Sequence, residues 1–238
     1  MKNTFKKLFI SFTVLSLTAC GSTTMQDNTF AAKENKDFTK YTNQLVVEYA
    51  ENDYTTMHQF FEHPEDYGID INNVDVSLGE FYTDNTEEIK EDQKELKKFN
   101  RSTLDKTQQT IYDELKYENE LSLKAENKKF QYLNNCGSTM SGLHQSLISV
   151  FSEYILRSEK DIQDLITLIN DVPRYTNDVL EYTKKQADKN TLQFDYDSVI
   201  QDIQDVINNK ENSSITSALY NAIDSLNLDE EKTTSYKA

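Results

Sequence analysis

The chain has 238 residues, of which 37% are hydrophobic and 28% charged, and its formal net charge is −16. The hydrophobic fraction suffices for a core, which excludes global disorder, and the few prolines (2) and glycines (5) favour long helices over a turn-rich β fold. The acidic surface repels phosphate groups, so we expect no nucleic-acid partner and no electrostatic binding to anionic lipid. The length allows one large helical domain or two small ones.

The N-terminus has the pattern of a secretory signal. Three lysines lie in residues 1–7, the mostly apolar run 8–17 follows, and small residues precede Cys20. The run is too short for a stable membrane span. Residues 17–21 (LTACG) resemble the bacterial lipobox, which implies a signal peptide over 1–19 and a diacylglycerol on the Cys20 thiol. We therefore expect an extracytoplasmic protein whose membrane contact is the lipid on Cys20, followed by a flexible tether over 20–34. An ordinary signal peptide with an incidental cysteine, or a buried helix, is the alternative.

The first half of the chain predicts helices of different character. Apolar residues recur at helical spacing in 35–51, and Asp53 is placed to cap a short helix over 54–62, which ends before Pro64. Residues 65–80 are expected to be irregular. The charged run 87–98 predicts a solvated helix, and Ser102 or Thr103 is expected to cap a long helix that continues to about residue 133.

The stretch 141–186 predicts three consecutive helices. Apolar residues at spacings of three and four mark the first, between Leu143 and Ile155. Ser158 and Asp161 form an acidic variant of the capping box at the start of the second. The sequence Asp171-Val172-Pro173 is expected to end the second helix and begin the third, because proline removes a donor inside a helix but fits its first turn.

The C-terminal part predicts two further helices. Asp197 is expected to cap one that carries Val199, Ile203 and Val206, and residues 208–214 form a break. A last helix is expected to bury Ile215, Leu219, Ile223 and Leu226. Residues 232–238 are expected to be a frayed tail. The whole predicts an all-α fold, an irregular bundle of about seven to eight helices, with one helical domain over 35–231.

Side chains that could perform chemistry are few and scattered. His58 and His63 are five residues apart, about 140° around a helix, and do not share a face as a zinc pair does. His144 lies beside an apolar stripe. Cys136 has no base nearby in the sequence and is expected to be an inert residue in a turn, although use of Cys136 as a nucleophile remained a third alternative. No nucleophile elbow, phosphate loop or dinucleotide motif is present, so the sequence predicts no catalytic residue, no metal ligand and no cofactor in this chain.

Several blocks in the same order resemble the N-terminal half of a bacterial family, domain of unknown function 885. The blocks are 45–48, Met57-His58, 64–69 (PEDYGI), Leu78-Gly79, 96–99, 104–115, and Ser141-Gly142 through 171–175 (DVPRY), within a coverage of 37–231. This resemblance implies a lipoprotein related to zinc metallopeptidases. The zinc-binding residues of such proteins lie on a later histidine-glutamate helix and a Pro-Gly-His segment, so zinc is expected only in a full-length member.

The sequence ends at Ala238 before such a motif, and none of its histidines matches a ligand position. The resemblance therefore predicts a non-catalytic N-terminal half that is inactive alone and whose partner is a missing C-terminal catalytic half. A truncated product, a fragment and one part of a split enzyme all fit this prediction. The alternative is a stand-alone helical surface lipoprotein that binds a peptide, a polymer or a protein.

Overall fold

The computed structural model describes residues 33–209 and 212–238. This described part is all-α: it holds nine α-helices and no strand, apart from an isolated bridge between Gly137 and Phe194. The predicted fold class is confirmed, with one helix more than expected. No helix in these residues is both long and apolar enough to cross a membrane. The predicted signal peptide, Cys20 and most of the tether lie outside the described residues.

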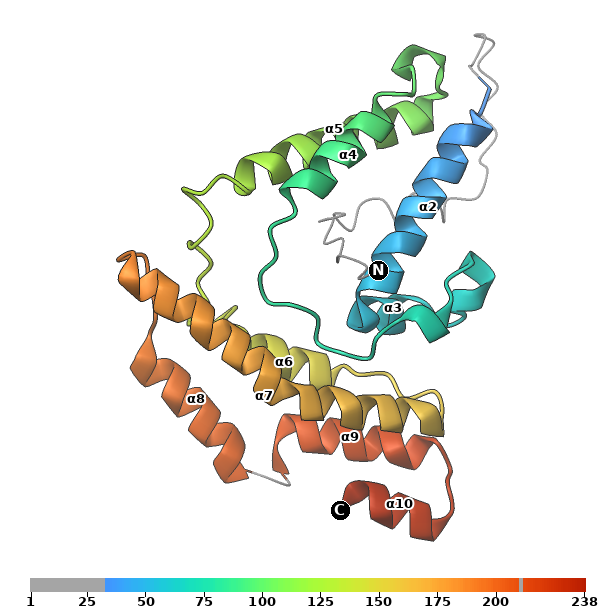
Figure 1. The fold of residues 1–238 in the computed structure, drawn as a ribbon. Helices are drawn as coiled ribbons and strands as arrows, with labels where there is room; N and C mark the ends of the chain where they lie inside the picture. The colour runs from blue at the N-terminus through green and yellow to red at the C-terminus, as the bar shows by residue number, and fades with distance from the viewer. Residues whose placement is uncertain (1–32, 210–211) are drawn as a thin grey trace. The chain divides into compact units, whose positions relative to one another are not determined.

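Most helices follow one another with short connections (Figure 1). The helices are α2 (Lys36–Asn52), α3 (Tyr54–Phe60), α4 (Thr86–Leu96), α5 (Lys106–Ala125), α6 (Leu143–Ser152), α7 (Glu159–Asp188), α8 (Tyr196–Asn209), α9 (Ser214–Ser225) and α10 (Glu230–Lys237), with short 3-10 helices η1 (Pro64–Tyr67), η2 (Ile71–Asn73) and η3 (Arg101–Thr103). The two long connections are 61–85, between α3 and α4, and 126–142, between α5 and α6. The helices gather in two compact units, unit 1 (Met1–Asn52 with Thr83–Gln131, described from residue 33) and unit 2 (Asp53–Tyr82 with Tyr132–Ala238). The predicted domain boundaries stay predictions, because packing into units does not establish independent folding.

Unit 1 is built from α2, α4 and α5 around a small apolar core. Its buried residues are Phe38, Leu45, Leu96, Leu104 and Leu115. The ring of Phe38 meets Phe99 edge-on, with centroids 5.1 Å apart. The buried Gln108 side chain of α5 holds the start of α2, since it donates to the carbonyl of Asn35 and accepts from the Asn35 N–H, both at 2.9 Å. The outer face of α4 carries Glu–Lys pairs three residues apart, which confirms the predicted solvated helix.

Unit 2 is organised by α7, whose 30 residues bury one continuous apolar side. That side carries Ile162, Leu165, Leu168, Val179 and Tyr182. Helix α6 packs against α9, and α10 packs against α9. Phe81 and Tyr175 add to a cluster around Cys136 and Tyr182, with the rings of Phe81 and Tyr182 5.2 Å apart. Residues 83–131 of unit 1 separate the two segments of unit 2 in the sequence. The core of unit 2 contains residues from both segments, such as Phe81 and Tyr175.

The predicted break at Asp171-Val172-Pro173 is wrong, because α7 passes through Pro173 without interruption. A proline inside a helix costs about 3 kcal/mol. Pro173 is exposed, so the carbonyl that loses its intrahelical donor can be hydrated. Burial of Leu168 on one side and Val179 on the other, worth roughly 1.5–3 kcal/mol each, outweighs the local cost.

Both ends of the long helix in unit 1 were also mispredicted. Helix α5 is capped by Asp105, whose side chain accepts from the Gln108 N–H at 2.8 Å, while the predicted caps Ser102 and Thr103 lie in η3. The helix ends at Ala125, eight residues before the predicted end. Leu133, in the segment that was expected to be helical, is 53% exposed and brings no burial to extend the helix.

Three further corrections concern helix ends. Helix α3 stops at Phe60, two residues early, because Phe61 adopts an extended conformation and is buried. Helix α8 begins at Tyr196, and Asp195 rather than Asp197 accepts from a first-turn N–H, that of Ser198, at 3.2 Å. The tail expected to fray forms α10, because the hydroxyl of Tyr236 donates to Glu159 on α7 at 2.7 Å.

Candidate functional site

The three histidines lie in different settings within the described residues. His58 is buried in α3, His63 precedes η1 with its Nδ1 3.4 Å from Glu65, and His144 sits in the first turn of α6. Among the residues that the structure describes, no three His, Cys, Asp or Glu side chains gather as a metal site would require. None of the three thus has a metal-binding environment in this part of the chain.

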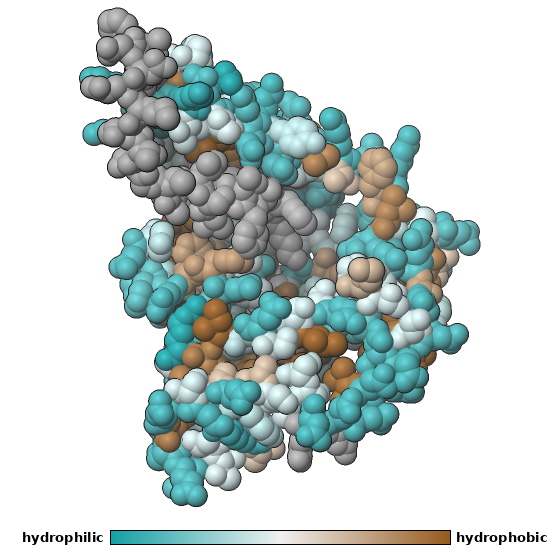
Figure 2. Space-filling view, turned by 180° about the vertical axis from the view of Figure 1, so that it is seen from behind, coloured by the Kyte–Doolittle hydropathy of each residue, from teal (hydrophilic) through white to brown (hydrophobic). Residues whose placement is uncertain are grey.

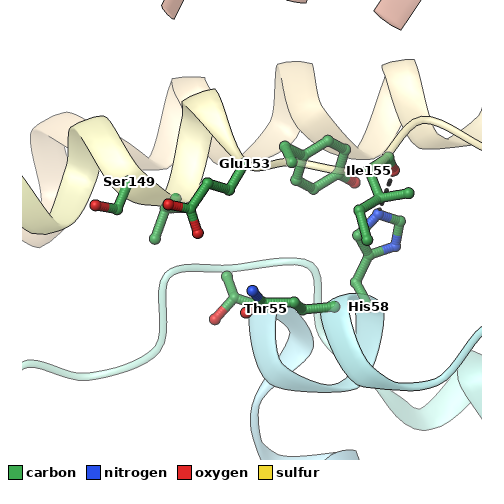
Figure 3. A pocket seen from close by; sticks show the side chains of 8 residues that line it. Thr55, His58, Ser149, Glu153 and Ile155 are labelled. Atoms are coloured by element: carbon green, nitrogen blue, oxygen red, sulfur yellow. Dashed lines mark hydrogen bonds between the residues drawn. The ribbon is translucent and has the colours of Figure 1, made fainter. Parts of the chain in front are cut away.

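His58 lies at the centre of a polar cluster in unit 2. Its ring stacks on those of Tyr54 and Tyr154, with centroids 5.5 and 4.4 Å away and interplanar angles of 12°. Its Nε2 lies 2.7 Å from the carbonyl oxygen of Ile155, which can only accept, so Nε2 carries the proton (Figure 3). Burial lowers the pKa of His58 despite the nearby Asp161. The ring is held as a neutral donor to the backbone that follows α6.

The two tyrosines of this cluster share hydrogen bonds with an acidic residue. The hydroxyl of Tyr54 lies 2.9 Å from that of Tyr154 and donates to Asp164, also at 2.9 Å. Burial raises the pKa of both tyrosines well above the usual value, so both hydroxyls stay protonated. Lys160 pairs with Asp164 from the solvent side. The arrangement fixes α3 against the segment that joins α6 to α7.

Arg157 and Asp161 close the cluster. Arg157 donates to the carbonyl of His58 at 2.9 Å. Asp161 accepts from the N–H groups of Arg157 and Ser158 at 3.0 and 2.7 Å, which confirms the predicted cap of this helix. Its other oxygen is 3.7 Å from His58 Nδ1, beyond hydrogen-bond distance. Arg157, Asp161 and His58 Nε2 therefore serve the structure, and His58 Nδ1 is left without a close hydrogen bond.

A small cavity of about 130 Å³ opens beside His58, between α3 and the end of α6. Figure 3 shows Ser149 and Glu153 on one wall and Thr55 on the other. The Thr55 hydroxyl donates to Asp53 at 2.7 Å, which occupies it in the cap of α3. The cavity is below the size of most small-molecule sites, which hold roughly 300–1,000 Å³.

A larger apolar groove of about 490 Å³ lies between α6, α7 and α8, in the size range of ligand sites. We call it the α8 groove; its lining includes Leu143, Leu147, Val172, Val179, Leu180, Phe194, Val199, Ile203, Val206 and Ile207. Leu180 is 49% exposed and Ile207 59% exposed. On the face drawn in Figure 2, apolar residues interrupt a largely hydrophilic surface. Within the described residues, the stripe predicted along α8 is thus only about half covered.

Few polar groups line the α8 groove. His144, whose side chain is 7% exposed, has Nε2 3.2 Å from the Asp202 carboxylate of α8. Since a carboxylate accepts, Nε2 donates, and the buried Nδ1 has no hydrogen-bond partner among the described residues. The Cys136 thiol donates to the Asn134 carbonyl at 3.6 Å, and burial raises its pKa to about 11. A thiol of that pKa is a poor nucleophile at neutral pH.

Two glycines allow close packing in the turn that precedes α6. A Cβ on Gly137 would lie 2.3 Å from the ring of Phe194, and a Cβ on Gly142 would lie 2.4 Å from the carbonyl oxygen of Ser138. Only a residue without a side chain fits either position. The Ser141-Gly142 block seen in the sequence therefore serves the tight entry into α6.

Sequence reasoning missed the partners that complete these sites. The hydrogen bonds of Tyr54 join residues 100 and 110 positions apart, and His144 meets Asp202 from 58 positions away. The signal that was available is local: Tyr54 and His58 are four residues apart and share a helix face. The rings of Tyr54 and Tyr154 are buried in the core, whereas their hydroxyls make the polar contacts of the cluster.

The fold and these sites define an all-α protein of two helical units, with a buried His–Tyr–Asp cluster and an open apolar groove in unit 2. Residues 72–238 match the family described as "Bacterial protein of unknown function (DUF885)". This match covers more than half of the chain, so the chain belongs to that family, as its sequence blocks predicted. No curated protein and no solved structure matches the chain.

Proposed function

We propose that this chain is a lipid-anchored extracytoplasmic protein whose helical part binds a partner and is inactive alone as an enzyme. The observation that carries the binding role is the α8 groove, where Leu180 and Ile207 leave about half of their surface in water. Apolar area costs about 25 cal/mol per Å² when exposed, so a partner that covers it gains stability. By its resemblance, the helical part corresponds to the non-catalytic N-terminal half of zinc-peptidase-like proteins.

The engagement of the reactive side chains supports the non-catalytic role. His58 donates to Ile155, Asp161 caps α7, and burial keeps Cys136 protonated. Asp161 and Cys136 are thereby withdrawn from general-base and nucleophilic roles, and His58 keeps only its Nδ1 as an acceptor, 3.7 Å from Asp161. The full chain with zinc added should therefore hydrolyse no peptide. Zinc-dependent hydrolysis that a chelator abolishes would contradict the proposal.

The anchor rests on the signal-like N-terminus and on Cys20. Metabolic labelling with an alkyne fatty acid should mark the wild-type chain and not Cys20→Ser. Fractionation should place the wild type in the membrane pellet and leave it accessible to protease added outside the cytoplasmic membrane. Equal labelling of both chains, or a wild-type chain protected from that protease, would refute the anchored extracytoplasmic location.

The binding role is tested with the full chain carrying Cys20→Ser, which lacks the lipidation thiol. A neutral fluorescent probe such as Nile red should bind this chain, and Leu180→Ser should weaken binding by about tenfold. Leu121→Ser is the matched control, because Leu121 is 47% exposed on α5 and lies outside the groove. Equal loss with both variants would remove the groove as the site.

A further inference from the structure

A second cavity in unit 2 contains hydrogen-bond acceptors that the fold leaves free. It has a volume of about 220 Å³ and lies between α3, the segment 61–76 and residues 157–164; we call it the Asp161 cavity. We propose that the Asp161 cavity binds a primary ammonium group on a short apolar stem, which is the chemistry of a lysine side chain or a small alkylamine. The cavity shares no lining residue with the α8 groove, so such a site is separate from the binding function proposed above.

Two carboxylates in the first turns of α7 each keep one oxygen free. Asp161 accepts through Oδ2 from the N–H groups of Arg157 and Ser158, and Asp164 accepts through Oδ2 from the Tyr54 hydroxyl. Among the described residues, no donor forms a hydrogen bond with either Oδ1. Both side chains are nevertheless largely buried, with 14% and 13% of their surface exposed. A carboxylate oxygen withdrawn from water without a donor is costly, so the site gains from a ligand that brings N–H groups.

His58 supplies a third acceptor in the lining of the same cavity. Its side chain is 8% exposed, its Nε2 donates to the Ile155 carbonyl, and its Nδ1 lies 3.7 Å from the free Oδ1 of Asp161. Burial lowers the pKa of His58, so the ring is neutral and Nδ1 carries a lone pair. The ring nitrogen and the carboxylate oxygen thus face each other without a proton to share. One ammonium group placed beside them can donate to both, because it has three N–H bonds that point in different directions.

The rest of the Asp161 cavity is apolar and has the size for one side chain. Its apolar lining includes Met57, Phe61, Ile71, Val74 and Val76. At about 220 Å³ it is smaller than the sites of drug-sized ligands, roughly 300–1,000 Å³, and larger than the space of one or two waters at roughly 30 Å³ each. An ammonium group on a stem of four or so carbons, as in lysine, can place its charge at the acceptors and its stem against the apolar lining. A guanidinium is planar, and its fork suits the two oxygens of one carboxylate, whereas the free acceptors here belong to different side chains.

The charges in the lining also favour a cation. The charged residues that line the cavity are four acidic and two basic ones: Glu62, Glu65, Asp161, Asp164, Arg157 and Lys160. An excess of two negative charges therefore remains, and an anionic ligand would bring acceptors to a site that already lacks donors. Arg157 is engaged, since its guanidinium donates to the His58 carbonyl at 2.9 Å. Lys160 pairs with Asp164 but is 65% exposed, so it competes with a ligand for that carboxylate and can turn away into solvent.

Four small ligands test the proposal on the full Cys20→Ser chain at neutral pH. They are n-pentylamine, pentanol, which has no charge, pentanoate, which has the opposite charge, and trimethylpentylammonium, which has the charge but no N–H. Titrations followed by the NMR signals of the Arg157 and Ser158 amides should give pentylamine a Kd of about 1 mM or below, and each of the others should bind at least about tenfold more weakly. The ¹⁵N signal of His58 Nδ1 should shift with pentylamine and not with the trimethyl compound, because only the amine donates a hydrogen bond to it.

Matched variants locate the binding. Asp161→Asn keeps an oxygen for the cap of α7 and removes the charge, so it should weaken pentylamine at least about fivefold. Asp105→Asn is its control, because Asp105 caps α5 in the same way and lies outside the cavity, and it should leave the Kd unchanged. Lys160→Met should strengthen binding about twofold or more by removing the competing cation. Lys184→Met, whose ammonium pairs with Glu181 outside the cavity, should not. A gain of affinity in Lys160→Met alone cannot arise from a loss of folding.

Three results would overturn the proposal. If pentylamine and the trimethyl compound bind equally, charge alone acts and the free acceptors do not select an ammonium group. If pentanol binds as tightly as pentylamine, the cavity is only an apolar hole. If none of the four binds, water fills the cavity and satisfies its acceptors.

A blocked tripeptide with a central lysine distinguishes the two sources of the ammonium group. Binding as tight as that of pentylamine would assign the cavity to a lysine side chain of a polypeptide. Binding of pentylamine without binding of the tripeptide would assign it to a free small amine. The Nile red test of the α8 groove reads different residues, so either proposal can fail while the other stands.

Discussion

Replacement of Asp171 by alanine should loosen the loop at Leu78-Gly79 from α7. Asp171 accepts from the Leu78 N–H at 2.8 Å and from Arg174 Nε and Nη2 at 2.6 and 2.7 Å. Arg174 in turn donates to the Gly79 carbonyl at 2.8 Å. Two separate sequence blocks, Leu78-Gly79 and DVPRY, thus meet through one carboxylate and one guanidinium.

The magnitude follows from these contacts. An N–H that loses its acceptor costs about 1–3 kcal/mol, at the lower end for Leu78 because it is only half-buried. The pair with Arg174, which is 44% exposed, adds at most about 1 kcal/mol after solvent screening. We expect a loss of about 2 kcal/mol in the free energy of unfolding, or a fall in Tm of about 4–8 °C for a domain of this size.

Asp178→Ala is the matched control. The Asp178 carboxylate also accepts a hydrogen bond from Arg174, at 2.7 Å, but its side chain is 40% exposed. It should cost less than about 1 kcal/mol. Thermal melts by circular dichroism compare the two, and hydrogen exchange should show the Leu78 amide deprotected in Asp171→Ala alone. Equal melts with a still-protected Leu78 amide would refute the reasoning.

The same contact predicts a pH dependence. Hydrogen bonds from Arg174 lower the pKa of Asp171, so its stabilising contribution is present above the unfolded pKa of about 3.9 and is lost as pH falls through the lower folded value. Wild type and Asp171→Ala should therefore converge in stability below about pH 4. A constant difference from pH 7 down to pH 2 would contradict this assignment.

Three other substitutions or reactions test the remaining structure. Tyr54→Phe should cost about 1–2 kcal/mol in urea unfolding through its two lost hydrogen bonds, and Tyr67→Phe, at an exposed tyrosine, close to nothing; equal costs would refute the cluster. Cys136 in the Cys20→Ser chain should react with iodoacetamide at pH 8 at least about 100-fold more slowly than free cysteine, since burial raises its pKa to about 11; rapid labelling of the folded chain, followed by mass spectrometry, would refute this burial. Pro173→Ala should stabilise α7 by about 1–3 kcal/mol in a thermal melt, and a loss of stability would show that the chain needs the proline.

Helix starts that depend on neighbouring residues could be predicted from the sequence. Asp53 accepts from the Thr56 N–H at 2.9 Å, as its position indicated, and Asp161 accepts from Ser158 as the capping pattern required. Caps are local, because the acceptor and the N–H lie within three residues of each other. The cap at Asp105, which was not predicted, obeys the same rule. The predicted caps Ser102 and Thr103 lie in η3, and α5 begins after it.

Competition between a local cost and distant burial could not be predicted. Pro173 carries a local penalty, and whether α7 continues depends on what Leu168 and Val179 bury against elsewhere in the fold. The His58 cluster could not be predicted for the same reason. Apolar periodicity predicted that Tyr154 is helical, but Tyr154 lies in the irregular segment after α6. Its ring leaves the helical path to stack on His58 at 4.4 Å. Periodicity reports which face is apolar and contains no information on the partner of that face.

This limit matters most at the α8 groove. The apolar stripe of α8 is as regular as that of α7, yet Leu168 of α7 is fully buried while Ile207 of α8 remains 59% exposed. A stripe that the chain covers itself and one left for a partner have the same sequence signature. Net charge does not separate the two helices either, because α7 carries seven acidic and four basic residues, and α8 carries three acidic residues and no Lys or Arg. What decides between the two stripes is which elements pack against each one, and that depends on contacts distant in the sequence.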